Sequence, residues 1–147
     1  GRIGQAVERL ARAHGMEVVH STRTGGLPLE ELLAAADAVS LHLPLTPEST
    51  HLIDARALAR MKPTAVLVNT SRGPIVDEQA LVRALTEGSI AGAALDVFED
   101  EPAMAPGLAK VNVSVETPLV TSITPPAAPR VRKARANRGM REVSMLI

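Results

Sequence analysis

The hydrophobic positions of this chain follow two different periods. Short apolar runs, several of them rich in β-branched residues, predict buried strands over residues 16–20, 38–43, 66–69, 93–95 and 111–115. Between these runs the apolar residues recur every three or four positions, which predicts helices over residues 3–14, 29–36, 54–61 and 78–87. Strands that alternate with helices in this way are typical of an α/β fold whose sheet is mainly parallel.

The ends of these helices carry start and stop signals. Asp54 and Asp77 stand where an N-cap is needed, and Gly15 and Gly88 follow the first and the fourth helix. Along one side of the first helix lie the apolar residues Ile3, Val7, Leu10 and Ala11. Charged residues lie on the opposite side. This helix is therefore predicted to be amphipathic.

One arginine occupies a position that suggests chemistry. The apolar run at 66–69 breaks into small polar residues, then Arg72 and a Gly-Pro pair, which indicates a loop that leaves the carboxyl end of a buried strand. Ligands of open α/β sheets bind where the strands end and the loops begin. The planar guanidinium of Arg72 is therefore placed to hold a carboxylate with two parallel hydrogen bonds.

The composition narrows the class of protein. The 147 residues include a single phenylalanine and no tryptophan, tyrosine or cysteine. So few aromatic residues argue against a surface that stacks nucleic-acid bases, and the lack of cysteine excludes disulfides, a thiol nucleophile and a thiolate metal site. No run is long and apolar enough to span a bilayer. We expect a cytoplasmic protein that binds neither nucleic acid nor membranes.

Two stretches resemble one protein family. Residues 68–78 read VNTSRGPIVDE, and residues 92–102 read GAALDVFEDEP. Both are similar to the D-isomer-specific 2-hydroxyacid dehydrogenases, especially the glyoxylate/hydroxypyruvate reductase branch, and the resemblance runs from Gly1 to about Val115. It implies a Rossmann-type doubly wound parallel sheet. It also implies a homodimeric oxidoreductase that moves a hydride between NAD or NADP and a small 2-keto or 2-hydroxy acid.

The resemblance implies roles for individual residues as well. Arg72 would bind the carboxylate and the keto oxygen of the substrate, and Glu101 would orient and tune a catalytic histidine. Asp96 would hold the carboxamide of the nicotinamide. The other candidate cofactor contacts follow the predicted strands: Leu43, Pro44, Thr50, Thr70 and Ser71. The alternatives are a surface arginine at Arg72, a strand-end cap at Asp96 and a solvated acidic run at Glu101.

The first four residues, Gly1-Arg2-Ile3-Gly4, are similar to the end of a G-x-G-x-x-G phosphate loop. Glycine lets the backbone approach a pyrophosphate, and the helix that begins here would direct N–H groups and partial positive charge at it. A simple turn is the alternative. Because the first glycine and the strand before it are missing, we expect a fragment whose sheet lacks its central strand. The strands beside that gap would have unpaired edges.

Cofactor specificity depends on the loop after the predicted strand at 16–20. Enzymes that use NAD usually place an acid here to bind the ribose 2′-hydroxyl. This chain has no acid between His20 and Glu30 and offers Thr22, Arg23 and Thr24 instead. A guanidinium and hydroxyls suit a 2′-phosphate, so the loop favours NADP over NAD. The alternative is a solvated loop arginine.

The catalytic histidine of the family has no counterpart. The family reads Pro-His-Ile-Gly after its last strand, and this chain reads Pro-Leu-Val-Thr at 118–121. Reduction of a keto acid needs a general acid near neutral pH. None of the four histidines is expected to replace it or to bind a metal: His14, His20, His42 and His51. We therefore expect the chain to be inactive or nearly so.

The pattern changes after residue 117. Residues 118–147 hold six basic residues and one acid, although the whole chain has no net charge. Prolines and the lack of an apolar stripe predict an irregular tail beyond a partial dinucleotide-binding domain at 1–117. A frameshifted reading of GC-rich DNA is favoured over a basic tail for an anionic partner. Either way, residues 121–147 are expected to pack poorly.

Three functional hypotheses follow. The first is the NAD(P)-binding domain of a reductase that acts on glyoxylate or hydroxypyruvate, lacking its substrate domain. The second is a non-catalytic NAD(H)-sensing module of the corepressor type, and the third is a decayed fragment. Arg72 and Glu101 do not separate the first two, because such corepressors resemble the dehydrogenases at these positions too.

Overall fold

The computed structural model describes residues 1–111, 113–115 and 142–146. The helices are α1 (Arg2–Ala13), α2 (Leu29–Ala35), α3 (Ala55–Arg60) and α4 (Glu78–Thr86), with short 3₁₀ turns η1 (Gly73–Ile75) and η2 (Leu108–Lys110). The strands are β1 (Glu17–Thr22), β2 (Gly25–Gly26), β3 (Ala38–Leu41), β4 (Val66–Asn69), β5 (Gly92–Leu95), β6 (Val113–Val115) and β7 (Glu142–Leu146). Every predicted strand and helix is present, with its ends within two residues of the prediction.

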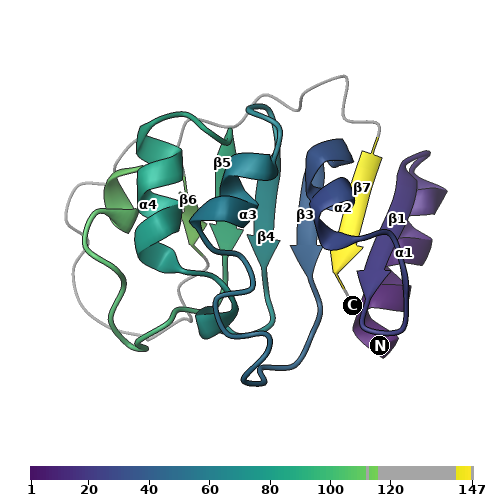
Figure 1. Cartoon of the computed structure of the whole chain (residues 1–147), viewed down its shortest axis with the longest axis horizontal. Coiled ribbons are helices and arrows are strands. Elements are labelled where there is room, and N and C mark those ends of the chain that lie inside the picture. Colours follow the sequence, from purple (N-terminus) through teal and green to yellow (C-terminus); the bar gives the residue numbers. More distant parts are fainter. Residues whose placement is uncertain (112, 116–141, 147) are drawn as a thin grey trace, which may run out of the picture.

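These strands form one sheet in the order β2-β1-β7-β3-β4-β5-β6. Only β2 runs antiparallel, as a short return that pairs with β1, and the other described pairs are parallel. The carboxyl ends of the parallel strands therefore meet along one edge of the sheet, the lower edge in Figure 1. The predicted Rossmann-type α/β fold is confirmed.

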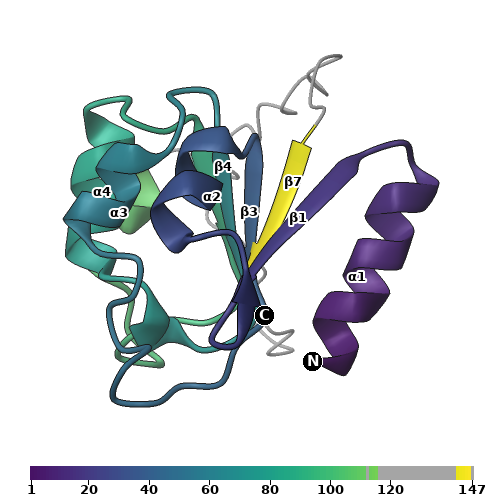
Figure 2. The same ribbon diagram turned by 45° about the vertical axis from the view of Figure 1, so that its right-hand side comes forward.

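Helices lie on both faces of this sheet. Figures 1 and 2 show α2, α3 and α4 on one face and α1 on the other. The core lies under the three helices, because each of them buries leucines against the strands. Its fully buried side chains include Leu32, Leu33, Val39, Leu41, Leu58, Leu67 and Leu81. Each buried aliphatic side chain of this layer stabilises the fold by about 1.5–3 kcal/mol.

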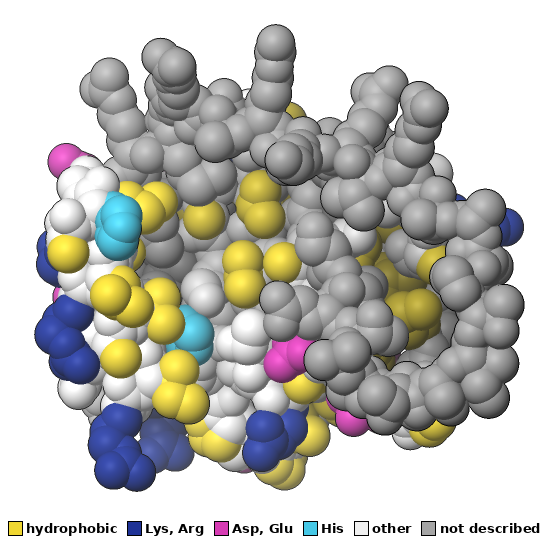
Figure 3. Space-filling view, turned by 180° about the vertical axis from the view of Figure 1, so that it is seen from behind, with side chains coloured by type: hydrophobic (Ala, Val, Ile, Leu, Met, Phe, Trp, Pro, Cys, Tyr) yellow, Lys and Arg dark blue, Asp and Glu magenta, His cyan; other side chains and the backbone are white. Residues whose placement is uncertain are grey.

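The apolar stripe of α1 is only half used. Val7 and Ala11 pack near the buried Val18 of β1, whereas Ile3 and Leu10 are 70% and 63% exposed. Figure 2 shows α1 leaning away from the sheet, and among the described elements it packs mainly against β1 and β7. Figure 3 views this face, where hydrophobic side chains of the described residues reach the surface.

The expected gap in the middle of the sheet is filled. β7 lies between β1 and β3 and pairs in parallel with both, so that Val143 is opposite Val18 on one side and Ala38 on the other (Figure 1). The prediction of two unpaired edges is therefore wrong, and so is the prediction of an irregular tail for residues 142–146. The physical reason is that β1 and β3 each offer a row of backbone groups that need partners.

No helix within the described residues is long and apolar enough to cross a bilayer.

Candidate functional site

A cavity of about 750 Å³ opens at the carboxyl ends of β1 and β3. Four of the predicted cofactor residues line it: Thr22, Arg23, Leu43 and Pro44. Sequence analysis missed the others: Ser21, Leu29, Thr46, Glu48, Ser49 and Leu52. Apolar walls with a few polar groups, at the carboxyl edge of an α/β sheet, are typical of small-molecule sites.

The loop that carries Arg23 is a tight hairpin between β1 and β2. The Thr22 hydroxyl donates a hydrogen bond to the carbonyl of Gly25 (2.8 Å) and accepts one from the amide of Thr24 (3.3 Å). Gly26 has φ +94°, and a Cβ there would lie 2.2 Å from the carbonyl oxygen of His20, so only glycine fits. The hydroxyl of Thr22 is thus hydrogen-bonded within the turn, and the exposed Arg23 lies at the tip of the turn.

A second loop, residues 44–50, forms the opposite wall of this cavity. The buried Ser49 hydroxyl donates to the carbonyl of Pro44 (2.9 Å) and accepts from the amide of Thr46 (2.7 Å). Hydrogen bonds from its own backbone amide and from the Thr46 side chain lower the pKa of the exposed Glu48. Thr50 does not line this cavity, and its hydroxyl donates to the carbonyl of Thr46 (3.0 Å), so its contact with a cofactor stays a prediction.

The predicted phosphate loop lies at the amino end of α1. Gly1 is the N-cap, no side chain caps the helix, and Gly4 is buried. Figures 1 and 2 place this end at the same edge of the molecule as the carboxyl ends of the strands. Gly1, Arg2, Ile3 and Gly4 do not line the 750 Å³ cavity, and their contact with a pyrophosphate stays a prediction.

The loop after β4 presents Arg72 to solvent. Asn69, only 1% exposed, donates from Nδ2 to the carbonyl of Arg72 (2.9 Å) and accepts from the amide of Ser71 (3.0 Å). The Ser71 hydroxyl donates to the carbonyl of Leu41 at the end of β3 (2.5 Å). Thr70 is exposed beside it. Among the described residues, no carboxylate forms an ion pair with Arg72, whose Nη1 donates only to the Ser71 carbonyl (2.7 Å).

The two predicted acids lie in the next loop along the sheet. Asp96 is exposed at the end of β5, and its amide donates to the carbonyl of Asn69 (3.0 Å). Glu101 is exposed too, and its Oε1 accepts from the amide of Phe98 (3.1 Å). Asn69 thus joins the loop of Arg72 to the start of the loop of Asp96. An asparagine at the end of a buried strand is the signal that could have revealed it.

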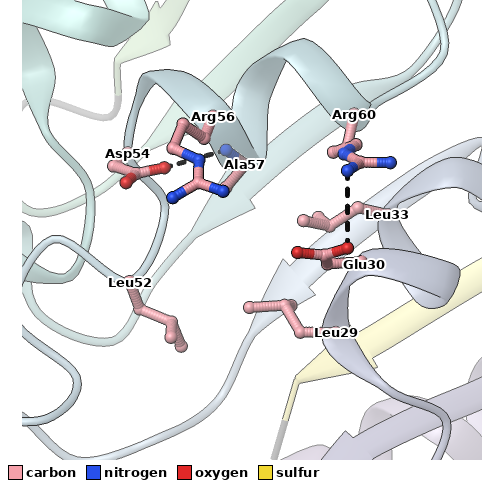
Figure 4. Close-up of a pocket in the computed structure, with 8 residues that line it drawn as sticks. All are labelled: Leu29, Glu30, Leu33, Leu52, Asp54, Arg56, Ala57 and Arg60. Carbon is pink, nitrogen blue, oxygen red and sulfur yellow. Dashed lines mark hydrogen bonds and ion pairs between the residues drawn. The ribbon is translucent and has the colours of Figure 1, made fainter.

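A second hollow, of about 200 Å³, lies between α2 and α3 (Figure 4). Leu29 and Leu52 line both hollows. At its rim Arg60 forms an ion pair with Glu30 (3.5 Å), and Asp54 accepts from the amide of Ala57 (2.8 Å) as the N-cap of α3. Most of its polar groups are therefore already engaged, and it is much smaller than the 750 Å³ cavity beside Arg23.

Comparison with known proteins assigns the family. The model of the D-isomer specific 2-hydroxyacid dehydrogenase NAD-binding domain matches residues 1–121. The chain belongs to the D-isomer specific 2-hydroxyacid dehydrogenases. Glyoxylate reductase of Thermococcus litoralis is 45% identical to it over 135 residues, which cover 84% of this chain and 41% of that protein. The chain spans about two fifths of the length of the curated relatives that it matches.

Solved structures of dehydrogenases share this fold. The NADPH-dependent glyoxylate/hydroxypyruvate reductase of Sinorhizobium meliloti, in complex with NADP and malonate, has a TM-score of 0.73 and 40% identity, covering 78% of this chain and 39% of that chain. The NAD-complexed D-isomer specific 2-hydroxyacid dehydrogenase of Lactobacillus delbrueckii ssp. bulgaricus has a TM-score of 0.69 and 33% identity, covering 78% and 42%. Both NAD and NADP thus occur in complexes of related dehydrogenases.

The histidine that dehydrogenases of this family are expected to use would stand at residue 119, outside the described residues. The described histidines lie elsewhere. His14 caps α1 through the carbonyl of Leu10 (2.8 Å), and His20 is exposed on β1. His51 lies against Glu99, as Nε2 and Oε1 are 2.5 Å apart. No cluster within the described residues could hold a metal ion.

His42 is expected to make the stability of this domain depend on pH. It follows β3, and its Nε2 is hydrogen-bonded to the hydroxyl of Ser40 (2.9 Å). Its burial lowers its pKa from the usual value of 6.5. Because the unfolded chain binds this proton more readily, stability is full above pH 6.5 and decreases as the pH falls through 6.5 toward the folded-state pKa.

We expect His42→Asn to reduce that dependence. Thermal melts at about pH 7.5 and about pH 5.5 should show a smaller loss of Tm in the variant than in the parent chain, because asparagine does not titrate. A variant that loses as much Tm as the parent chain would mean that other groups cause the acid sensitivity.

Proposed function

We propose that this chain is the dinucleotide-binding domain of a reductase that acts on a 2-keto acid of the glyoxylate or hydroxypyruvate type. The observation that carries the proposal is the exposed Arg72. Its backbone is fixed by Asn69 at the carboxyl edge of the sheet, and no described carboxylate neutralises it. A guanidinium held in this way is suited to a substrate carboxylate. The malonate complex of the Sinorhizobium meliloti relative supports a carboxylate ligand.

The cofactor and three residues of the chain have separate proposed roles. A nicotinamide cofactor, when bound, supplies or accepts the hydride. Arg72 holds the carboxylate of the substrate and polarises its keto oxygen, and Asp96 holds the carboxamide of the nicotinamide. Glu101 is the acid that would orient a histidine. Since leucine stands at position 119 where the family has that histidine, we propose that the chain binds its ligands without significant turnover.

The cofactor we favour is NADP. Arg23 stands at the tip of the hairpin on the cavity wall, where a 2′-phosphate would gain a charged partner. Thr24 lies beside Arg23 in the same turn. The hydroxyl of Thr22 is already hydrogen-bonded within that turn. The carboxylate of Glu48 lines the same cavity, and its lowered pKa keeps it charged. The positive charge of Arg23 must therefore outweigh the repulsion between Glu48 and a 2′-phosphate.

Fluorescence titration of the purified chain with NADPH and NADH tests this function. We expect saturable binding of NADPH, tighter than that of NADH. Arg23→Ser should weaken NADPH binding by about tenfold, the lower end for a hydrogen bond to a charged group because the site is exposed, and should change NADH binding less than about twofold.

Arg83→Ser is the matched control, since Arg83 is exposed on α4 and does not line the cavity. It should leave both affinities unchanged. A chain that binds neither dinucleotide would refute the proposed function, and equal losses for NADPH and NADH in Arg23→Ser would refute the preference for NADP.

A further inference from the structure

The loops of Arg72 and Glu101 touch through their backbones. Gly73 follows Arg72, and a Cβ at Gly73 would lie 1.8 Å from the carbonyl oxygen of Phe98 and 2.5 Å from the amide nitrogen of Glu99. No other residue type leaves the loops this close. The position of Arg72 relative to Glu101, the two predicted catalytic residues, therefore depends on how the segment after Phe98 is held.

That segment is held by a buried carboxylate outside the predicted site. Glu78, the first residue of α4, is 3% exposed. Its Oε1 accepts from the amide of Glu99 (2.6 Å), and its Oε2 accepts from the amide of Ala105 (3.0 Å). One side chain thus fixes both ends of the segment 99–105, which carries Glu101.

Glu99 extends these contacts to a third loop. Its carboxylate accepts from the amide of Glu78 (3.4 Å) and contacts the ring of His51 (2.5 Å). The amide of His51 donates to the carbonyl of Pro74, two residues beyond Arg72 (2.8 Å). The loops after β3, β4 and β5 are therefore joined around Glu78 and Glu99.

Burial of the Glu78 carboxylate requires compensating interactions. Removing a charged group from water costs several kcal/mol unless hydrogen bonds or an opposite charge offset that cost. Within the described residues Glu78 has no cationic partner, so the two backbone N–H groups are its compensation. An apolar residue would fill the same space without this cost, but it could not hold two amides of the loop.

We propose that Glu78 is a positioning residue, which sets the loop of Glu101 against that of Arg72 and so shapes the grip on the substrate carboxylate. The proposal rests on the proposed function of Arg72. Glu99 and His51 assist Glu78 by joining the third loop.

Glu78→Gln tests the proposal with little change in shape. Glutamine keeps one acceptor but turns an N–H donor toward the other amide, so one of the two hydrogen bonds is lost. Glu87→Gln is the matched control, since Glu87 is the exposed C-cap of the same helix. Both variants are compared with the parent chain by NMR, well below their melting temperatures.

The first readout is the cross-relaxation between the Gly73 Hα protons and the Glu99 amide proton. We expect Glu78→Gln to weaken it at least twofold and Glu87→Gln to preserve it. The second readout is the affinity for malonate, followed at the Arg72 Nε–H signal of the NADPH-saturated chain. We expect Glu78→Gln to lower this affinity about fivefold, by loss of roughly one hydrogen bond, with NADPH affinity changed less than twofold.

Each outcome decides the matter. An unchanged Gly73–Glu99 signal in Glu78→Gln overturns the proposal, and so does a weakened signal with unchanged malonate affinity, which assigns Glu78 to the fold alone. Equal losses for malonate and NADPH overturn it as well. A parent chain that binds NADPH but shows no malonate response refutes the role of Arg72, and with it any role of Glu78 in gripping the substrate.

Discussion

The substitution Ser144→Pro is expected to lower the melting temperature of the chain by about 10 °C. Ser144 is in the middle of β7, opposite Val19 of β1 and Val39 of β3. Proline has no backbone N–H, so one ladder hydrogen bond is lost at the centre of the sheet and a carbonyl is left without its donor. Together with the clash of the ring, this costs roughly 3 kcal/mol.

Ser144→Ala is the control for this change. It keeps the backbone N–H and should melt close to the parent chain. Circular dichroism melts of the three proteins would check the prediction. If Ser144→Pro melted like Ser144→Ala, residues 142–146 would not be a central strand of the sheet.

Loss of the Arg72 guanidinium should abolish most carboxylate binding and leave the affinity for the cofactor nearly unchanged. Arg72→Leu removes two charge-assisted hydrogen bonds to a bound carboxylate, which corresponds to a loss of malonate affinity of about 10- to 100-fold. The affinity for NADPH should change less than about twofold, because the cavity beside Arg23 is formed by other loops. Calorimetric titration of the NADPH-saturated chain with malonate measures both effects.

Arg72→Lys separates charge from shape. Lysine keeps the positive charge but loses the planar pair of donors, so we expect an affinity between those of the parent chain and Arg72→Leu. If Arg72→Leu bound malonate as tightly as the parent chain, Arg72 would be an ordinary surface residue and the carboxylate would bind elsewhere.

The sequence predicted the part of the site that depends on strand ends. Once Val66–Asn69 and Gly92–Leu95 are recognised as neighbouring parallel strands, Arg72 and Asp96 must follow them at the same edge. The same reasoning placed Arg23 and Pro44 after β1 and β3, and the structure shows that both line one cavity. Local apolar patterns suffice for this, because each strand is defined by its own residues.

What the sequence did not reveal depends on contacts between distant residues. His51 and Glu99 lie in different loops, and an acidic run such as 99–101 gives no sign of which carboxylate bonds inward. Buried Glu78 looked like an ordinary first-turn acid of a helix, which favours the helix dipole by itself. Ile3 and Leu10 followed the helical period perfectly, yet α1 leaves them exposed. Periodicity states which side of a helix is apolar, and tertiary structure decides whether that side is covered.

The place of β7 in the sheet has a consequence for folding. β1 and β7 come from opposite ends of the sequence, and β7 also completes the edge of β3. Such a pairing closes a long loop before it gains any contact energy, which slows folding. Until that loop closes, the edges of β1 and β3 that β7 covers in the folded chain are open to any strand that can pair with them. We therefore expect refolding yield to fall as the protein concentration rises, because the β7 of a second molecule offers the same backbone groups.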